Sequence, residues 1–383
     1  MIEGGKILEG NGRIKYIDAV ETISMFLVIY CHYPELSGTS AASHIAMLFA
    51  TTFAMPMFFI CNGALLLNKK DIDVRRHLKK TFMLYVSTVL WKIIYIAVVL
   101  SAYPASVFEK FKTSILYCLL GNCRIDGLDL AIDHFWFTNA LIAVYLIFPL
   151  IKFAYDKSPE YIKFLAVLLF VFDFLLVEYN FWADIMKYGL EFEVPRFDTL
   201  KTTMYPFAEA ASYLLYFILG GIVHRKFHGA KIGTGKRISL IAIIAVSYAY
   251  LLYAKFVQMG TLSGTWYRLE GDYHRIGTLA MAVSAYILFA TADFSKTKTA
   301  NKIFFFVSLR TMNIYCVHML LCYLFDKYFL PYISVRGVFP HAAKTLAVML
   351  VSILITEPLT YIPPVRKLLN LQPDHKKTTS EGV

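Results

Sequence analysis

Long apolar segments alternate with short polar ones along nearly the whole chain. Ten of these segments are apolar over roughly 20 residues, the length that a helix needs to cross a bilayer. The pattern therefore predicts an all-α polytopic membrane protein with about ten transmembrane helices. The predicted spans centre on residues 17–35, 44–67, 82–102, 134–154, 161–178, 206–224, 239–259, 274–292, 303–330 and 341–362.

The segment 113–121 is apolar but too short to span, so we expect an interfacial or re-entrant piece before the fourth span. Cys118 and Cys123 lie at its end and could form a disulfide if this loop is outside the cell. The other four cysteines fall inside apolar runs and are expected to be small buried residues. No Cys or His spacing suits zinc, so we expect no metal site.

The composition supports a membrane protein. Hydrophobic residues make up 58% of the chain and charged residues 17%, whereas soluble domains carry about 25% charged residues. We find no linker or second soluble domain, and we expect one integral-membrane domain over 1–370 with a cytoplasmic polar tail at 371–383. The first ten residues have no apolar core, so no cleavable signal peptide is expected.

The distribution of Lys and Arg predicts the orientation. The two termini and the loops after spans 2, 4, 6 and 8 carry 24 of these residues, against 10 in the opposite loops. Cytoplasmic loops are the basic ones, so both termini are expected in the cytoplasm of a multi-pass protein of the bacterial cell membrane. The net charge of +11 is then a topology signal, and nucleic-acid binding is not expected.

The first span contains three ionisable residues. If it is helical, Asp18, Glu21 and His32 share one face, because eleven residues return almost to the same angle at about 3.6 per turn. His32 is the strongest candidate for a general base, since an imidazole titrates near neutrality. The alternative is a histidine that is satisfied by a neighbouring helix. Asp18 and Glu21 would line a path to His32 from the cytoplasm.

Basic residues after the second span form a candidate anion site. Arg75, Arg76, Lys79 and Lys80 could hold the phosphates of a nucleotide-like cofactor, or pair with anionic lipid headgroups. Arg310 stands eight residues before His318. Its guanidinium could bind an anionic ligand inside the helix bundle. The alternative is that its side chain extends to the membrane–water interface.

Four other residues are candidates for substrate binding. Asn62 is a polar point inside the second span, and His318 lies within the ninth. Trp136 stands beside His134 at the outer start of the fourth span. Aromatic rings beside polar groups can stack on sugars, although interfacial belts also use Trp and Tyr. Lys92 and Lys255 are cations within apolar runs, and such residues need a partner or a wet cavity.

The ordered set of these segments resembles the acyltransferase-3 family of bacterial integral-membrane acyltransferases, which modify cell-surface glycans. Each motif is weak alone, but together they cover nearly the whole chain in family order. The matching segments are 17–21 with Cys31 and His32, FFICNG at 58–63, the basic run 75–80, HFWF at 134–137 with Tyr145 and Pro149, 213–220, IYCVH at 314–318, and Glu357 with Pro358.

The resemblance implies that acetyl-CoA enters from the cytoplasm and that its acetyl group passes to a hydroxyl of a cell-surface polysaccharide or lipid-linked sugar. It ties His32 to catalysis and the basic run to the CoA phosphates. Glu21 stands where relatives carry a cation, so we expect it to repel a phosphate there. The alternative is a transporter or flippase for a polar substrate, with Asp18, Glu21, Lys92 and Lys255 as its working groups. Membrane lipid is an expected partner, and a homodimer is left open.

Overall fold

The computed structural model describes residues 13–32, 41–121, 125, 127–205, 207, 212–258, 273–329 and 337–371. All regular secondary structure within these ranges is helical, which confirms the predicted fold class. The elements are α1 Lys15–Tyr30, α2 Ala41–Leu67, α3 Val74–Leu100, α4 Ala105–Leu120, η2 Asp133–Phe135, α5 Trp136–Lys157, α6 Pro159–Phe170, η3 Val171–Leu175, α7 Leu176–Leu190, α8 Asp198–Met204, α9 Ser212–Phe227, α10 Thr234–Gln258, α11 Ile276–Ala290, α12 Lys298–Ser308, α13 Thr311–Tyr328, α14 Val338–Thr360 and α15 Pro363–Leu368.

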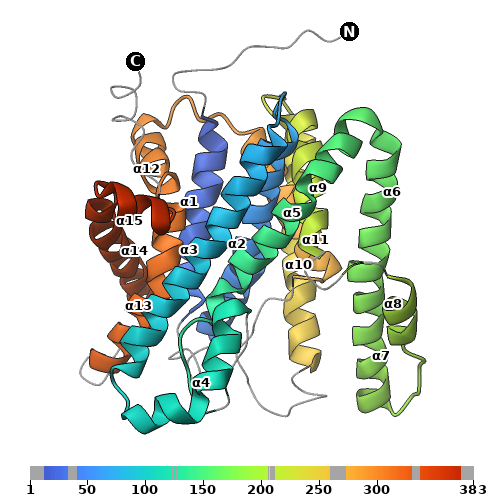
Figure 1. Ribbon diagram of the computed structural model, residues 1–383. Coiled ribbons are helices and arrows are strands. Elements are labelled where there is room, and N and C mark those ends of the chain that lie inside the picture. The colour runs from blue at the N-terminus through green and yellow to red at the C-terminus, as the bar shows by residue number, and fades with distance from the viewer. Residues whose placement is uncertain are drawn as a thin grey trace.

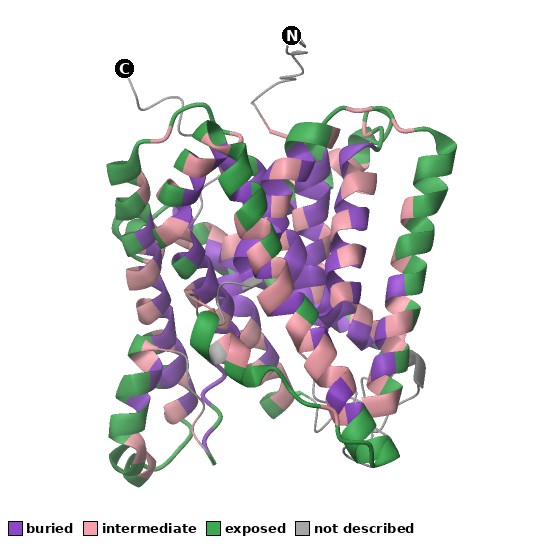
Figure 2. Ribbon diagram, turned by 90° about the vertical axis from the view of Figure 1, so that its right-hand side faces the viewer, coloured by how far each residue is buried: buried purple, intermediate pink, exposed green. Residues whose placement is uncertain are grey.

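The long helices run side by side along one direction, and α4 lies at the end opposite to the start of α1 (Figure 1). Buried residues gather in the middle of the bundle (Figure 2). Large apolar side chains remain exposed on the outer helices, for example Leu150 at 71%, Val246 at 68% and Leu354 at 71%. Such residues suit contact with lipid, because an outer surface this apolar would be unfavourable in water.

The helix α2 lies at the centre and packs against α1, α9 and α11. Its contact with α9 is unusually close at two glycines. A Cβ on Gly63 would stand 1.8 Å from the Phe217 carbonyl oxygen, and one on Gly220 would stand 2.1 Å from that of Ile60. Small residues permit this approach of two backbones, as in other membrane helix pairs.

The structure supports a multi-pass membrane protein, but the number of spans stays a prediction. Among the described residues, five helices are long and apolar enough to cross a membrane, or six if a bent pair counts as one span. Helices also occupy the other predicted segments. Of these, α1 and α9 have 16 residues and α11 has 15. Which side faces the cytoplasm likewise stays a prediction.

The segment 303–330 is not the single straight helix that its hydropathy predicts. It is divided between α12 and α13, which are bent by 69° at a break after Ser308. Arg310 stands at this break, where its guanidinium binds both carboxylate oxygens of Glu357 at 2.7 and 3.0 Å. A cation that is only 4% exposed needs such a partner, so the pair joins the start of α13 to α14.

The apolar segment 113–121 forms the second half of α4, whose side chains are mostly exposed apart from Ile115 and Cys118. Cys118 is disulfide-bonded. Its predicted partner Cys123 lies outside the described residues. The Nζ of Lys92, within α3, donates to the carbonyl oxygens of Cys118 at 3.1 Å and of Gly121. The carbonyl end of α4 thereby satisfies this buried cation.

Candidate active site

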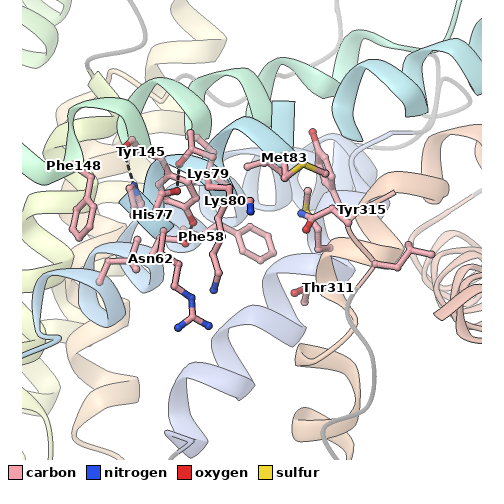
Figure 3. A pocket seen from close by; sticks show the side chains of 18 of the residues that line it. Phe58, Asn62, His77, Lys79, Lys80, Met83, Tyr145, Phe148, Thr311 and Tyr315 are labelled. Atoms are coloured by element: carbon pink, nitrogen blue, oxygen red, sulfur yellow. Dashed lines mark hydrogen bonds between the residues drawn. The ribbon is translucent and has the colours of Figure 1, made fainter. Parts of the chain in front are cut away.

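A cavity of about 1420 Å³ opens between α1, α2, α3, α5 and α13 (Figure 3). Its mouth is basic. Two acidic residues, Asp71 and Asp73, also lie there, but Asp73 is the N-cap of α3 and accepts from the Arg76 amide at 2.9 Å. The cations that line the mouth are Lys69, Arg76, Lys79, Lys80, Arg366 and Lys367.

The structure divides the predicted anion-binding residues. Arg76, Lys79 and Lys80 line the cavity, whereas Arg75 and Arg310 are not among its lining residues. Arg310 is instead held by Glu357. Sequence reasoning missed Lys69, Arg366 and Lys367, which it counted only as topology charges. The last two belong to α15, which packs against α3 from the far end of the chain.

A polar ring lies halfway down the cavity, formed by Glu21, Asn62, His77 and Tyr145. The Tyr145 hydroxyl donates to Oδ1 of Asn62 at 2.5 Å, and Nδ2 of Asn62 donates to the Phe58 carbonyl at 2.9 Å. Nε2 of His77 donates to the Tyr145 carbonyl at 2.8 Å. The sequence predicted Asn62 as a ligand-binding residue, and the structure places its amide on this cavity (Figure 3).

Asp18 and Glu21 have different surroundings although they share a helix face. Asp18 accepts from Arg13 at 2.6 Å and from the Ser308 hydroxyl at 2.7 Å, so it ties α1 to α12. It does not line the cavity. Glu21 does line it, with Arg13 Nη2 3.9 Å from its carboxylate. Glu21 and Met25 are thus the residues of α1 that line the cavity, and a path onward to His32 stays a prediction.

The inner end of the cavity is apolar. The predicted histidines His32, His134 and His318 do not line it. Other side chains separate them from the cavity. The residues at this end are Met25, Met55, Phe58, Phe137, Leu141 and Tyr315. The cavity thus changes along its length from basic, through polar, to apolar.

Beyond this end the structure brings together three predicted residues from distant segments. The His318 ring lies 5.4 Å from that of His32 and 5.2 Å from that of His134, measured between centroids. His134 and His318 are fully buried, and His32 is half-buried. The described residues contain no group of His, Cys, Asp and Glu arranged to hold a metal ion. We refer to His32, His134 and His318 as the histidine cluster.

The tautomer of His318 follows from its hydrogen bond. Nδ1 lies 2.7 Å from the Tyr315 carbonyl oxygen, which can only accept, so Nδ1 carries the proton. Nε2 then presents a lone pair, and it has no hydrogen-bond partner in the part of the chain that the structure describes. Tyr315 also donates its hydroxyl to the His134 carbonyl. One tyrosine thereby holds two members of the cluster.

Trp136 is the first residue of α5 and stands two residues after His134 in the chain. Its ring is 5.4 Å from the rings of both Tyr213 and Tyr273. Trp136 and Tyr273 are half-buried and so present part of their rings. The short helix η2 carries His134, and α5 begins at Trp136, so the two residues belong to the same junction between helices.

Comparison with known proteins identifies the family of the chain. A family model described as an acyltransferase domain, that of the acyltransferase-3 family, matches residues 14–360. No curated protein and no solved structure gives a significant match. Because the matched region covers most of the chain, the protein belongs to the acyltransferase-3 family and is an acyltransferase.

Proposed function

Since the chain is an acyltransferase of this membrane family, we propose that it is an O-acyltransferase that takes an acetyl group from acetyl-CoA. The acceptor is a hydroxyl of a cell-surface polysaccharide or lipid-linked sugar. The observation that carries the proposal is the cavity, which leads from a basic mouth on α3 and α15 to an apolar end beside the histidine cluster.

The gradient along the cavity fits the parts of acetyl-CoA. Phosphates suit the Lys and Arg side chains at the mouth, since guanidinium and ammonium groups bind phosphate oxygens by charge-assisted hydrogen bonds. The arm of CoA that carries amide groups suits the polar ring of cavity residues, where Asn62, Glu21 and Tyr145 offer hydrogen-bonding groups. The acetyl group suits the apolar end. This orientation also fits entry from the cytoplasm, because the mouth lies among the basic residues that predict the cytoplasmic side.

We infer that Glu21 does not oppose the binding of the phosphates. Its carboxylate lies in the polar ring and not at the mouth, with Arg13 3.9 Å away. There it can accept a hydrogen bond from an amide N–H of the arm. The carboxylate that replaces the family's cation is then compatible with CoA as donor.

The transfer step needs a base, and His32 is our choice. Its imidazole takes the proton from the acceptor hydroxyl while the oxygen attacks the thioester carbonyl carbon. The C–S bond breaks, and the leaving thiolate receives the proton from His32. The products are an O-acetyl ester and CoA, and His32 returns to its neutral form. Asp18 takes no part in this step, because its contacts with Arg13 and Ser308 join helices.

The aromatic group around Trp136 supports a sugar as acceptor. Trp136 and Tyr273 are half-buried, and their ring centroids lie 5.4 Å apart. Sugar rings stack on such faces through their C–H groups while their hydroxyls remain free to bond. A sugar stacked there would lie near the junction of η2 and α5, which carries His134.

No observation favours the transporter alternative. Two of its working groups are engaged: Asp18 pairs with Arg13, and Lys92 donates to the carbonyl end of α4.

The proposal is tested with purified full-length protein, radiolabelled acetyl-CoA and a panel of glycans. We expect CoA release and labelled glycan, both lost in His32→Ala. We also expect CoA to raise the melting temperature of both proteins, because His32 does not line the cavity. The absence of CoA release together with the absence of stabilisation by CoA would refute the proposal.

A further inference from the structure

The mouth of the cavity carries two separate groups of cations. Arg76, Lys79 and Lys80 stand in the first two turns of α3, and we call them the α3 cations. Arg366 and Lys367 stand in α15, and we call them the α15 cations. Although α15 comes from the far end of the chain, it packs beside α3 (Figure 1). The two helices therefore supply positive charge to one cavity from two places.

These five cations are not neutralised by the protein itself. None of them forms an ion pair with a carboxylate in the part of the chain that the structure describes. Buried arginines elsewhere are neutralised, since Arg275 is bound by Glu178 at 2.6 Å and Arg310 by Glu357 at 2.7 Å. Unpaired positive charge around a cavity raises the local concentration of anions, so the mouth favours an anionic ligand.

The α15 cations stand on a firmly attached segment. The Leu369 carbonyl, at the end of α15, accepts from Nε1 of Trp91 on α3 at 3.3 Å. The amide of Leu371 donates to the Arg366 carbonyl at 3.0 Å, and the Leu371 side chain is buried in the main core. Arg366 itself is half-buried. Because its backbone is already ordered, Arg366 loses less conformational freedom on binding a ligand than a cation on a loose segment would.

The α3 cations adjoin the polar ring, whereas α15 contributes no residue to it. His77 belongs to the ring, directly follows Arg76 and stands one turn before Lys80. In the proposed function the arm of CoA lies in this ring, and the diphosphate of CoA is joined directly to that arm. The α3 cations are therefore the ones next to the diphosphate, which leaves the α15 cations for another anionic group.

CoA carries such a group, a phosphate monoester on the 3′ position of its ribose. We propose that the α15 cations bind this 3′-phosphate while the α3 cations bind the diphosphate. This inference rests on the proposed function. A phosphate monoester carries about two negative charges near neutral pH, which suits the adjacent charges of Arg366 and Lys367. The protein then selects CoA thioesters over thioesters of phosphopantetheine alone, because the latter lack the 3′-phosphate.

The test compares CoA with dephospho-CoA, which lacks only the 3′-phosphate, by calorimetry on the full chain in detergent. In the wild type we expect dephospho-CoA to bind about tenfold more weakly than CoA. In Arg366→Gln we expect CoA to bind about tenfold more weakly than in the wild type, and dephospho-CoA to bind as it does in the wild type. Both ligands are titrated into the same preparation, so a folding defect would not imitate this difference.

Lys80→Gln is the matched variant on α3. It should weaken the binding of both ligands by the same factor, because both carry the diphosphate. Arg75→Gln is the control for a general effect of charge. Arg75 belongs to α3 but does not line the cavity, so both affinities should stay close to the wild-type values.

The outcomes separate the inference from the proposed function. If neither ligand binds the wild type, the donor assignment fails and the inference fails with it. If CoA and dephospho-CoA bind the wild type equally well, only the 3′-phosphate site is overturned. Equal losses for both ligands in Arg366→Gln overturn it too, since Arg366 would then contact another part of the donor. Unchanged binding of both ligands in Arg366→Gln also overturns it, and is the result expected if the α15 cations pair with anionic lipid headgroups instead.

Discussion

The ring of His318 on α13 lies 5.4 Å from the ring of His32 at the end of α1. The His318 tautomer is set by the Tyr315 carbonyl, which leaves the Nε2 lone pair available within a buried cluster. His318 is therefore a neighbouring ring of the base that we propose, and its substitution tests whether it takes part in the transfer.

The first prediction concerns this pair. His318→Gln keeps a carbonyl acceptor but loses the imidazole, and we expect acetyl transfer to fall by about tenfold, less than the loss of about 10²–10⁴-fold expected when the base His32 is removed. CoA affinity should stay at the wild-type value, since His318 does not line the cavity. Transfer and calorimetric titration are measured on the same preparations. A variant with full transfer activity would remove His318 from the mechanism.

The second prediction concerns the mouth of the cavity. Arg366→Gln removes a lining cation, and we expect CoA to bind about tenfold more weakly, with a smaller dependence on salt. Arg75→Gln is the matched control, because Arg75 has the same charge and lies on α3 next to Arg76 without lining the cavity. Equal losses in the two variants would point to a general field effect and not to a phosphate contact.

The third prediction concerns Glu21. Because its carboxylate lies in the polar ring, Glu21→Gln should leave CoA affinity within about threefold of the wild type, as the amide oxygen still accepts a hydrogen bond. A carboxylate that repels a phosphate would behave differently. Neutralising such a carboxylate would tighten the binding of CoA. A CoA affinity about tenfold or more above that of the wild type in Glu21→Gln would therefore show that Glu21 repels a phosphate, as the sequence predicts.

The fourth prediction concerns the contact of α2 with α9. Gly63→Ala would place a methyl group 1.8 Å from the Phe217 carbonyl oxygen, so the helices must separate. We expect a loss of about 1–3 kcal/mol or more, seen as a lower melting temperature in detergent. Gly235→Ala, at the start of α10 with open space around its Cα, should be neutral or slightly stabilising. Similar melting temperatures for the two variants would contradict the close approach.

The sequence by itself determined the class of structure. Hydropathy depends on each segment alone, so the apolar helices could be located without knowing what they pack against. The order of short motifs was also sufficient to indicate the family, which the match over residues 14–360 confirms. Three of the basic residues predicted for the donor, Arg76, Lys79 and Lys80, do line the cavity.

Only the tertiary structure decided which polar residues work together. Asp18 and Glu21 look equivalent on a helical projection, but Ser308 from α12 engages one and leaves the other on the cavity. An arginine such as Arg310 can bind a phosphate, yet in the structure its guanidinium is bound by Glu357 from α14. Arg366 and Lys367 reach the mouth from α15. Each of these outcomes depends on a contact between residues far apart in the chain, and the local pattern of a sequence does not contain such contacts.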